Sequence, residues 1–156
     1  MRLAPLVLAL AITVLPALSQ AQDAGLSSDE QILIKQINTD KKSLYAENLK
    51  LTEEESAKFW PIYDEYERAL KTYQDRLAAN INNFAEKYDT LTDADATAIL
   101  KEKMAIEKGR AELKQKYTAK VAKALPPKKA LRYAQLETRV QVLIDRNVYG
   151  LIPLAR

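Results

Sequence analysis

Two groups of acidic residues are the first candidates for chemistry in this chain of 156 residues. Three glutamates occupy positions 53–55, and further carboxylates follow at 64, 65 and 67. Paired carboxylates can act as general acid and base, and clustered ones can bind a hard cation such as Ca²⁺. Neither group has the spacing of a Ca²⁺ loop, and both are typical of a solvated helix face. We therefore expect no catalytic residue and no metal ligand among them.

The sequence lacks the side chains that most enzymes use. It contains 0 histidines, 0 cysteines and only 3 glycines. An imidazole base, a thiolate nucleophile, a cysteine-ligated zinc ion and a disulfide are therefore impossible. A glycine-rich phosphate loop is missing as well. These absences predict that the protein is not an enzyme and uses no cofactor.

The largest charged feature is a basic stretch in the second half of the chain. Residues 101–132 contain 11 basic and 3 acidic side chains, whereas residues 52–95 contain 5 basic and 11 acidic ones. The basic face is either solvated and paired with the acidic segment, or a surface that binds acidic or unfolded partners. Trp60 is a further contact candidate, because it lies one position off an apolar stripe. The candidate partner-binding residues are Trp60, Lys101, Lys103, Lys108, Arg110, Lys114, Lys116, Lys120 and Lys123.

The N-terminus has the pattern of a secretory signal peptide. Arg2 precedes an apolar stretch over residues 3–15, and small residues flank Gln20 in Ser19-Gln20-Ala21. An uncleaved membrane anchor is the alternative, but the apolar stretch is short and Pro16 follows it. We predict cleavage near Ala21 and a periplasmic protein. Loss of Arg2 lowers the net charge from +3 to +2, so we expect no nucleic-acid partner and no stable membrane insertion.

Residues 22–156 are expected to form one all-α domain of four helices, which must position these side chains. Apolar periodicity and capping boxes predict helices near 28–48, 53–88, 93–124 and 128–148. The second has apolar residues at intervals of 3 and 4 over about five heptads, which predicts an elongated molecule. Its tight turn to the third helix predicts an antiparallel hairpin with two flanking helices.

Three packing expectations follow from this hairpin. A hairpin one layer thick leaves much apolar surface uncovered, so we expect a homodimer shaped as a cradle. Gly109, in the middle of the third helix, is expected to let another backbone approach closely. The apolar tail at 149–154 is expected to dock against another surface.

Short motifs at the helix starts carry a family resemblance. Leu51-Thr52-Glu53-Glu54-Glu55 and, less closely, Leu125-Pro126-Pro127-Lys128-Lys129 resemble the motif of the LTxxQ family of Spy-like and CpxP-like periplasmic proteins. Glu55 and Lys129 stand where that family usually has Gln. The residues that carry over are Leu51, Thr52, Glu55 and Leu125. The resemblance implies a cradle-shaped all-α dimer, and its Spy-like members bind unfolded clients without ATP.

The favoured hypothesis is a periplasmic ATP-independent chaperone or envelope-stress accessory protein. It would bind unfolded or partner proteins of the envelope through a basic and apolar helical surface. The alternative is a non-chaperone interaction protein, either the partner of a sensor domain or a metal-stress accessory protein. That protein would bind through Trp60 and the 149–154 tail.

Overall fold

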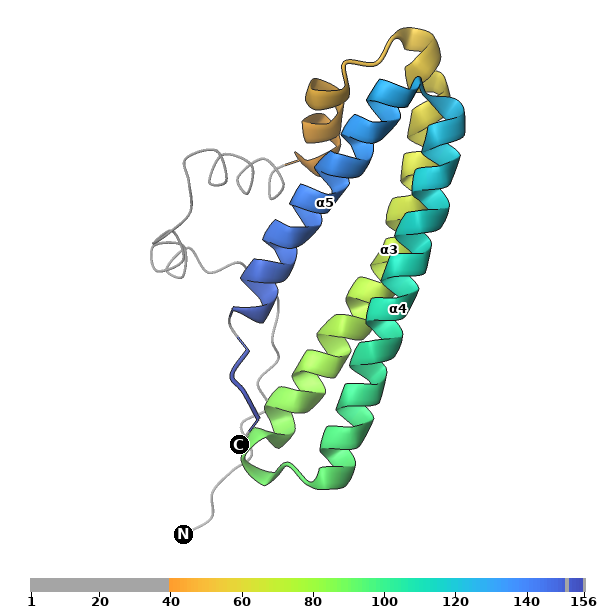
Figure 1. Ribbon diagram of the computed structural model, residues 1–156. Helices are drawn as coiled ribbons and strands as arrows, with labels where there is room; N and C mark the ends of the chain where they lie inside the picture. The colour runs from red at the N-terminus through yellow and green to blue at the C-terminus, as the bar shows by residue number, and fades with distance from the viewer. Residues whose placement is uncertain (1–39, 151, 156) are drawn as a thin grey trace, which may run out of the picture.

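The computed structural model describes residues 40–150 and 152–155 (Figure 1). This part of the chain is helical apart from short connections and includes no β-strand. Residues 40–49 are helical, and α3 (Glu53–Lys87), α4 (Asp93–Ala124) and α5 (Pro127–Tyr149) follow. The predicted all-α fold with a long hairpin and two flanking helices is confirmed. The predicted signal peptide and residues 28–39 of the first predicted helix lie outside the described residues.

α3 begins where the sequence predicts because Thr52 caps it. The Thr52 hydroxyl accepts a hydrogen bond from the Glu55 amide at 3.3 Å, and the Glu55 carboxylate accepts one from the Thr52 amide at 2.8 Å. This reciprocal capping satisfies two amides that have no partner within the helix. The helix has 35 residues and continues through Pro61, so it is about 52 Å long at 1.5 Å per residue.

The starts of α4 and α5 follow from equally local chemistry. Thr92 and Asp95 form a second capping box at the start of α4, directly after the short 3₁₀ helix η2 (Tyr88–Thr90). α4 ends at Ala124, because Pro126 disfavours helical backbone in the residue before it. Pro127 is the first residue of α5, where a missing amide hydrogen costs nothing. The predicted bounds of α4 are confirmed, and those of α3 and α5 differ from prediction by one residue at their ends.

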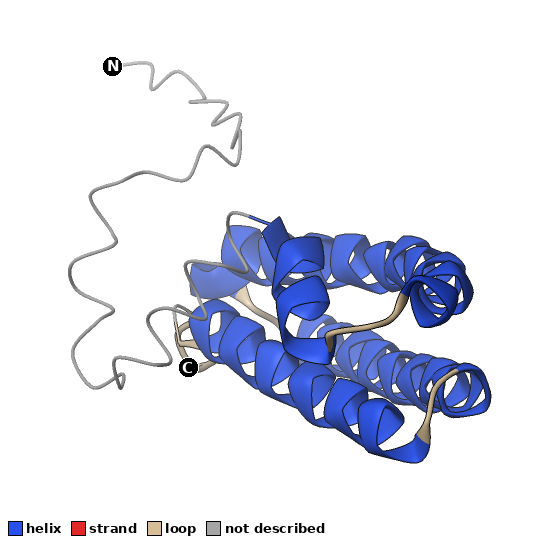
Figure 2. Cartoon of the chain, turned by 90° about the horizontal axis from the view of Figure 1, so that it is seen from above, coloured by secondary structure: helices blue, strands red, loops and turns tan. Residues whose placement is uncertain are grey.

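α3 and α4 lie side by side as an antiparallel hairpin, as Figure 1 and Figure 2 show. α5 and the helical residues 40–49 pack on the half of the hairpin that contains the start of α3 and the end of α4. The main core therefore lies at that end. Its buried residues are Leu44, Tyr45, Leu49, Phe59, Tyr63, Val121, Leu125, Ala130, Tyr133, Leu136 and Val140.

The other half of the hairpin is less well covered. The apolar stripe of α3 is buried as far as Leu70, but its continuation over Leu77, Ile81 and Phe84 is only half buried. α5 ends short of the turn between α3 and α4 (Figure 1), so this helix does not cover this part of the stripe. The sequence predicted one continuous inner face, whereas the structure divides it into a closed half and a half-open half.

The space beside Gly109 is occupied by the aromatic ring of Tyr73 and not by the backbone of another helix. A Cβ atom built on Gly109 would lie 2.3 Å from Cε1 of Tyr73 and 2.7 Å from its hydroxyl oxygen. The expected close approach is therefore present, but its cause is corrected. The missing side chain makes room for Tyr73 of α3 against α4, and the two backbones are not the groups in contact.

The apolar tail docks within its own chain, as expected of such a tail. Ile152 and Pro153 lie beside α3 residues of the half-open end, and the Tyr88 hydroxyl donates a hydrogen bond to the Leu154 carbonyl at 3.1 Å. The tail thus covers part of the stripe that α5 does not reach.

Candidate functional site

The predicted basic residues all lie on α4. Their side chains contact α3, α5 or α4 itself. Lys114 donates to the Thr138 hydroxyl on α5 at 2.9 Å. Lys120 instead forms an ion pair at 2.7 Å with Glu65 on α3. Lys103 and Lys108 pair with glutamates one turn further along α4 itself. A large part of the basic face is therefore paired within the chain, as the first of the two open interpretations expects.

The remaining cations of this set are more accessible. Lys116 lies over the ring of Tyr117, with its ammonium nitrogen 5.6 Å from the ring centre. Lys101 and Lys123 are exposed and take part in no ion pair with the described residues. These two lysines are the cations that an acidic partner could contact without breaking an existing pair.

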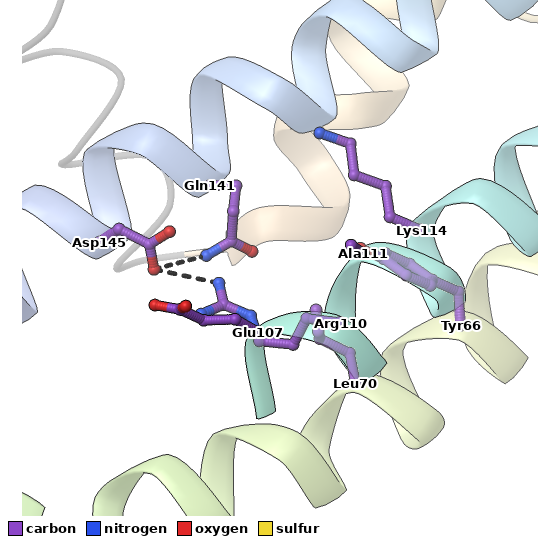
Figure 3. Close-up of a pocket in the computed structure, with 8 residues that line it drawn as sticks. All are labelled: Tyr66, Leu70, Glu107, Arg110, Ala111, Lys114, Gln141 and Asp145. Carbon is purple, nitrogen blue, oxygen red and sulfur yellow. Dashed lines mark hydrogen bonds and ion pairs between the residues drawn. The ribbon is translucent and has the colours of Figure 1, made fainter. Parts of the chain in front are cut away.

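Arg110 is the most enclosed of the predicted residues. Its guanidinium donates to Asp145 Oδ1 at 3.0 Å, and Gln141 Nε2 donates to the same oxygen at 2.9 Å (Figure 3). Gln141 and Asp145 are one turn apart on α5, so both face α4. The Arg110 side chain is only 13% exposed, which weakens solvent screening of the pair. Arg110 therefore connects α4 to α5 and is not a free surface cation.

A small hollow lies beside this ion pair, between α3, α4 and α5. Its volume is about 190 Å³, and Figure 3 shows the residues that line it. Every charged group in it has a partner, because Glu107 pairs with Lys103 and Arg110 pairs with Asp145. The lining residues are Tyr66, Leu70, Glu107, Arg110, Ala111, Lys114, Gln141 and Asp145.

A buried carboxylate that the sequence analysis missed lies close to this hollow. Glu137 of α5 is 1% exposed and accepts hydrogen bonds from the hydroxyls of Tyr66, at 2.7 Å, and of Tyr45. Tyr66 also lines the hollow, so the two features share a residue. The three residues come from α3, α5 and the helical segment 40–49. Glu137 thus connects three helices through one carboxylate.

The tyrosines around Glu137 are kept in their protonated form. Burial, followed by the negative charge of Glu137, raises the pKa of both Tyr45 and Tyr66 far above the ordinary value for a phenol. Burial raises the pKa of Tyr63 and Tyr133 in the same way. These hydroxyls therefore remain hydrogen-bond donors over the whole range in which proteins fold, and none of them is a candidate base.

A second carboxylate extends this polar cluster toward the surface. Glu67 on α3 pairs with Lys41 at 2.7 Å, and the Lys41 ammonium lies 5.8 Å from the centre of the Tyr45 ring. Burial raises the pKa of Glu67 above its ordinary value, and the charge of Lys41 and its hydrogen bond act in the opposite direction. The pair holds the 40–49 segment against α3 beside the Glu137 contacts.

Trp60 faces the same helical segment. It is half buried and packs edge-on against Phe59 and Tyr63, with ring centres 4.9 and 5.5 Å away. Lys42 places its ammonium 5.0 Å from the Trp60 ring centre and pairs with Asp64 at 2.9 Å. The structure thus places Trp60 against the helical residues 40–49 of its own chain.

The motif residues lie together at one end of the hairpin. Thr52 and Glu55 form the cap of α3, Leu125 is buried in the main core, and Leu51 packs at its edge. Glu55 also forms an ion pair with Lys129, whose ammonium donates to the Lys50 carbonyl at 2.9 Å. These contacts, with that of Lys129 first, lower the pKa of Glu55. Glu55 and Lys129, the fifth residues of segments 51–55 and 125–129, are therefore in direct contact.

No cluster of three or more acidic residues that could hold a metal ion occurs among residues 40–150 and 152–155. Over the same ranges, no helix is both long and apolar enough to cross a membrane. The chain matches no protein-family model, no curated protein and no solved structure. The resemblance to the LTxxQ family therefore stays a prediction.

Proposed function

We propose that this protein is an exported, ATP-independent chaperone-like or envelope-stress accessory protein. It binds unfolded or partner proteins of the periplasm through a surface of α4 that mixes basic and apolar side chains. The observation that carries the proposal is the exposure of Leu100 and Met104, which are 56% and 60% exposed and one helical turn apart. Lys101, between them in sequence, is exposed as well.

These side chains suit weak and unselective contacts with an unfolded chain. Met104 is unbranched and flexible, so it can adapt to differently shaped apolar partners. Lysines attract an acidic segment over a longer range than apolar contacts act, which speeds the first encounter. Among the described residues of this surface, the hollow at Arg110 is small and is lined in part by paired charges, so it offers no deep apolar pocket that would select one ligand.

The motif contacts agree with the proposed family. Glu55 and Lys129 hold complementary charges at the two positions where LTxxQ proteins usually have Gln, and here they form an ion pair. If Glu55 and Lys129 replace the two Gln residues of the family motif, their ion pair still connects the start of α3 to the start of α5. This supports a common layout for the two motif copies.

Suppression of aggregation tests the function directly. The mature chain, mixed at a stoichiometric ratio with a heat-unfolded client, is expected to lower light scattering at low salt. Replacing both Leu100 and Met104 by Gln is expected to reduce this protection several-fold. Ala98→Gln is the matched control, because Ala98 is exposed on the same helix but two positions from Leu100 and so on another face. Absence of protection by the unaltered chain would contradict the proposal.

Charge reversal separates the electrostatic part. Lys101→Glu with Lys123→Glu is expected to slow capture of an acidic client at low salt, and high salt is expected to abolish the difference. Equal capture rates for the variant and the unaltered chain at low salt would show that apolar contacts alone recruit clients.

The alternative interaction protein predicts a different binding pattern. Its expected contact residues, Trp60 and the tail, are engaged within the chain by Lys42 and by Tyr88. Affinity capture from a periplasmic extract distinguishes the two functions. A single partner in a stoichiometric amount favours the interaction protein, whereas many weakly held proteins favour the chaperone.

We also propose a homodimer. Large apolar side chains are exposed on α5 as well as α4, including Leu131 and Val142, and a second subunit would cover such surface. The molar mass from light scattering after size-exclusion chromatography tests this directly. A monomeric mass at micromolar concentration would refute the dimer and leave the aggregation test unaffected.

A further inference from the structure

The half-open end of the hairpin carries a groove that is bordered by the chain's own tail. Ile81, Phe84 and Ala85 lie along one face at the end of α3, and Tyr88 follows three residues later as the first residue of η2. Together with Ile152 and Pro153 they surround a space of about 280 Å³. Phe84 and Tyr88 meet edge to face, with ring centres 5.5 Å apart. The groove is therefore apolar and walled by two aromatic rings.

The tail residues that occupy this groove are not helical and are held by few contacts. Ile152 and Pro153 supply the apolar contact, and the Leu154 carbonyl accepts the hydrogen bond from Tyr88. The Leu154 side chain takes no part, because it is 88% exposed. Recognition thus uses one main-chain carbonyl and two apolar side chains, a combination that many unfolded sequences can supply.

The contact is also weak enough to be displaced. Ordering each tail residue costs on the order of 1–2 kcal/mol of backbone entropy, and a neutral hydrogen bond contributes only about 1 kcal/mol. The tail has two such bonds, from Tyr88 to the Leu154 carbonyl and from the Ile152 amide to the Tyr149 carbonyl at 3.2 Å. Ile152 is only half buried and Pro153 is exposed, so each contributes less than the about 1.5–3 kcal/mol of a fully buried side chain, and together they offset the remainder only in part. The tail holds its place mainly because its attachment to α5 keeps its local concentration high.

We propose that this groove is a binding site for extended apolar segments of unfolded polypeptides, and that the chain's own tail, which lies against the same apolar face, is an internal competitor. The inference rests on the proposed function and names a client site at the end of α3, apart from the exposed face of α4. Clients reach the groove when the tail leaves it, so release of the tail raises the affinity for such segments.

The test uses the full chain and a fluorescent peptide with the sequence of residues 149–155. Replacing Ile152 and Pro153 by Ser is expected to release the tail and tighten peptide binding about tenfold, as for a groove that is open one-tenth of the time in the unaltered chain. Leu154→Ser is the matched control. This control also replaces an apolar tail residue by Ser, but at a position where only the main-chain carbonyl contacts Tyr88. It is expected to leave the peptide affinity unchanged.

A second substitution locates the site. Ala85 is exposed on α3, so Ala85→Glu places a charged side chain in the groove without removing a core residue. In the chain with the released tail, this change is expected to abolish peptide binding. Circular dichroism of each variant verifies that its helix content is retained.

Several results would overturn the inference. Equal peptide affinity of the unaltered chain and the Ile152→Ser, Pro153→Ser variant would show that the tail does not compete. Undiminished binding to the Ala85→Glu variant would place the peptide elsewhere. A change from dimer to monomer on release of the tail would assign the groove to the tail of a second copy.

The aggregation assay separates this inference from the proposed function. Protection that is equal with and without Ala85→Glu would leave the chaperone function intact and refute the groove as a client site. Tail-regulated peptide binding without any suppression of aggregation would refute the chaperone function and leave the groove and its competitor in place.

Discussion

The Glu137 contacts allow a quantitative prediction about what holds the flanking helices in place. Glu137 is buried and accepts hydrogen bonds from the hydroxyls of Tyr45 and Tyr66. A hydrogen bond to a charged group contributes about 1.5–3 kcal/mol to stability. Tyr45→Phe and Tyr66→Phe are therefore each expected to lower the free energy of unfolding by about 1.5–3 kcal/mol.

The double variant is expected to lose more than the sum of the two single losses. With both donors removed, the Glu137 carboxylate remains in the core without either of its tyrosine donors, and a buried charge without compensation is strongly destabilising. The excess is expected to fall within the 0.5–3 kcal/mol typical of residues that share one partner. Adding Glu137→Leu to the double variant is expected to recover much of the loss, because no buried charge is then left unpaired.

Urea unfolding followed by circular dichroism measures these differences. Tyr117→Phe is the control, since its ring is also buried but its hydroxyl contacts no carboxylate among the described residues, and a change within about 0.5 kcal/mol is expected. The reasoning would be refuted by a double variant that loses less than the sum of the two single losses, which is at least about 3 kcal/mol. Failure of Glu137→Leu to restore stability would equally show that the carboxylate is not the source of the loss.

Two further predictions concern the hairpin. In a Tyr73→Ala background, Gly109→Ala is expected to stabilise the protein by about 1 kcal/mol. In the unaltered background it is expected to give little or no gain, because the Tyr73 ring occupies the space of the new methyl group. Thermal unfolding with and without Gly109→Ala in each background measures the difference. The hydrogen bonds from Lys87 and Thr92 lower the pKa of Asp95 to about 2, so this carboxylate stabilises the turn above its unfolded pKa near 3.8 and loses that effect as the pH falls toward 2. Asp95→Asn is therefore expected to flatten the dependence of urea-unfolding midpoints on pH between 4 and 2, and an unchanged slope would exclude Asp95 as its source.

The sequence predicts the helices well because local signals set their ends. Thr52 with Glu55 and Thr92 with Asp95 specify where α3 and α4 begin, and the two prolines at 126 and 127 separate α4 from α5. Each signal acts within about four residues of the chain, so it can be read without knowledge of the fold. The apolar intervals of α3 likewise identify its inner face, although not how much of that face is covered.

Contacts between distant helices could not be predicted in the same way. The opposite charges of residues 52–95 and 101–132 suggested that the two segments pair, but not which residues form the pairs. The structure uses specific pairs, such as the two-point contact of Arg76 with Glu102, at 2.8 and 3.0 Å, and the ion pair of Lys120 with Glu65. Which cation faces which helix depends on the rotation of α4, and composition does not contain that information.

Glu137 was missed although the sequence holds a signal for it. The residue comes four positions after Tyr133 and three before Val140, so it falls on the buried side of α5. An acidic residue on an apolar helix face requires a partner from another helix. The sequence does not show where that partner is, because Tyr45 lies 92 residues away and Tyr66 lies 71 residues away.

The uneven distribution of the core links the fold to the proposed binding surfaces. Glu137, its tyrosines and the main apolar cluster all lie where α5 and residues 40–49 cover the hairpin. At the other end, within residues 40–150 and 152–155, α3 and α4 pack only on each other and on the short tail, so local opening costs less free energy there. Exposed Leu100 and Met104 lie in the first half of α4, which belongs to the same end. A binding protein that must adapt to varied clients benefits from this division, because the closed half preserves the fold while the half-open end exchanges partners.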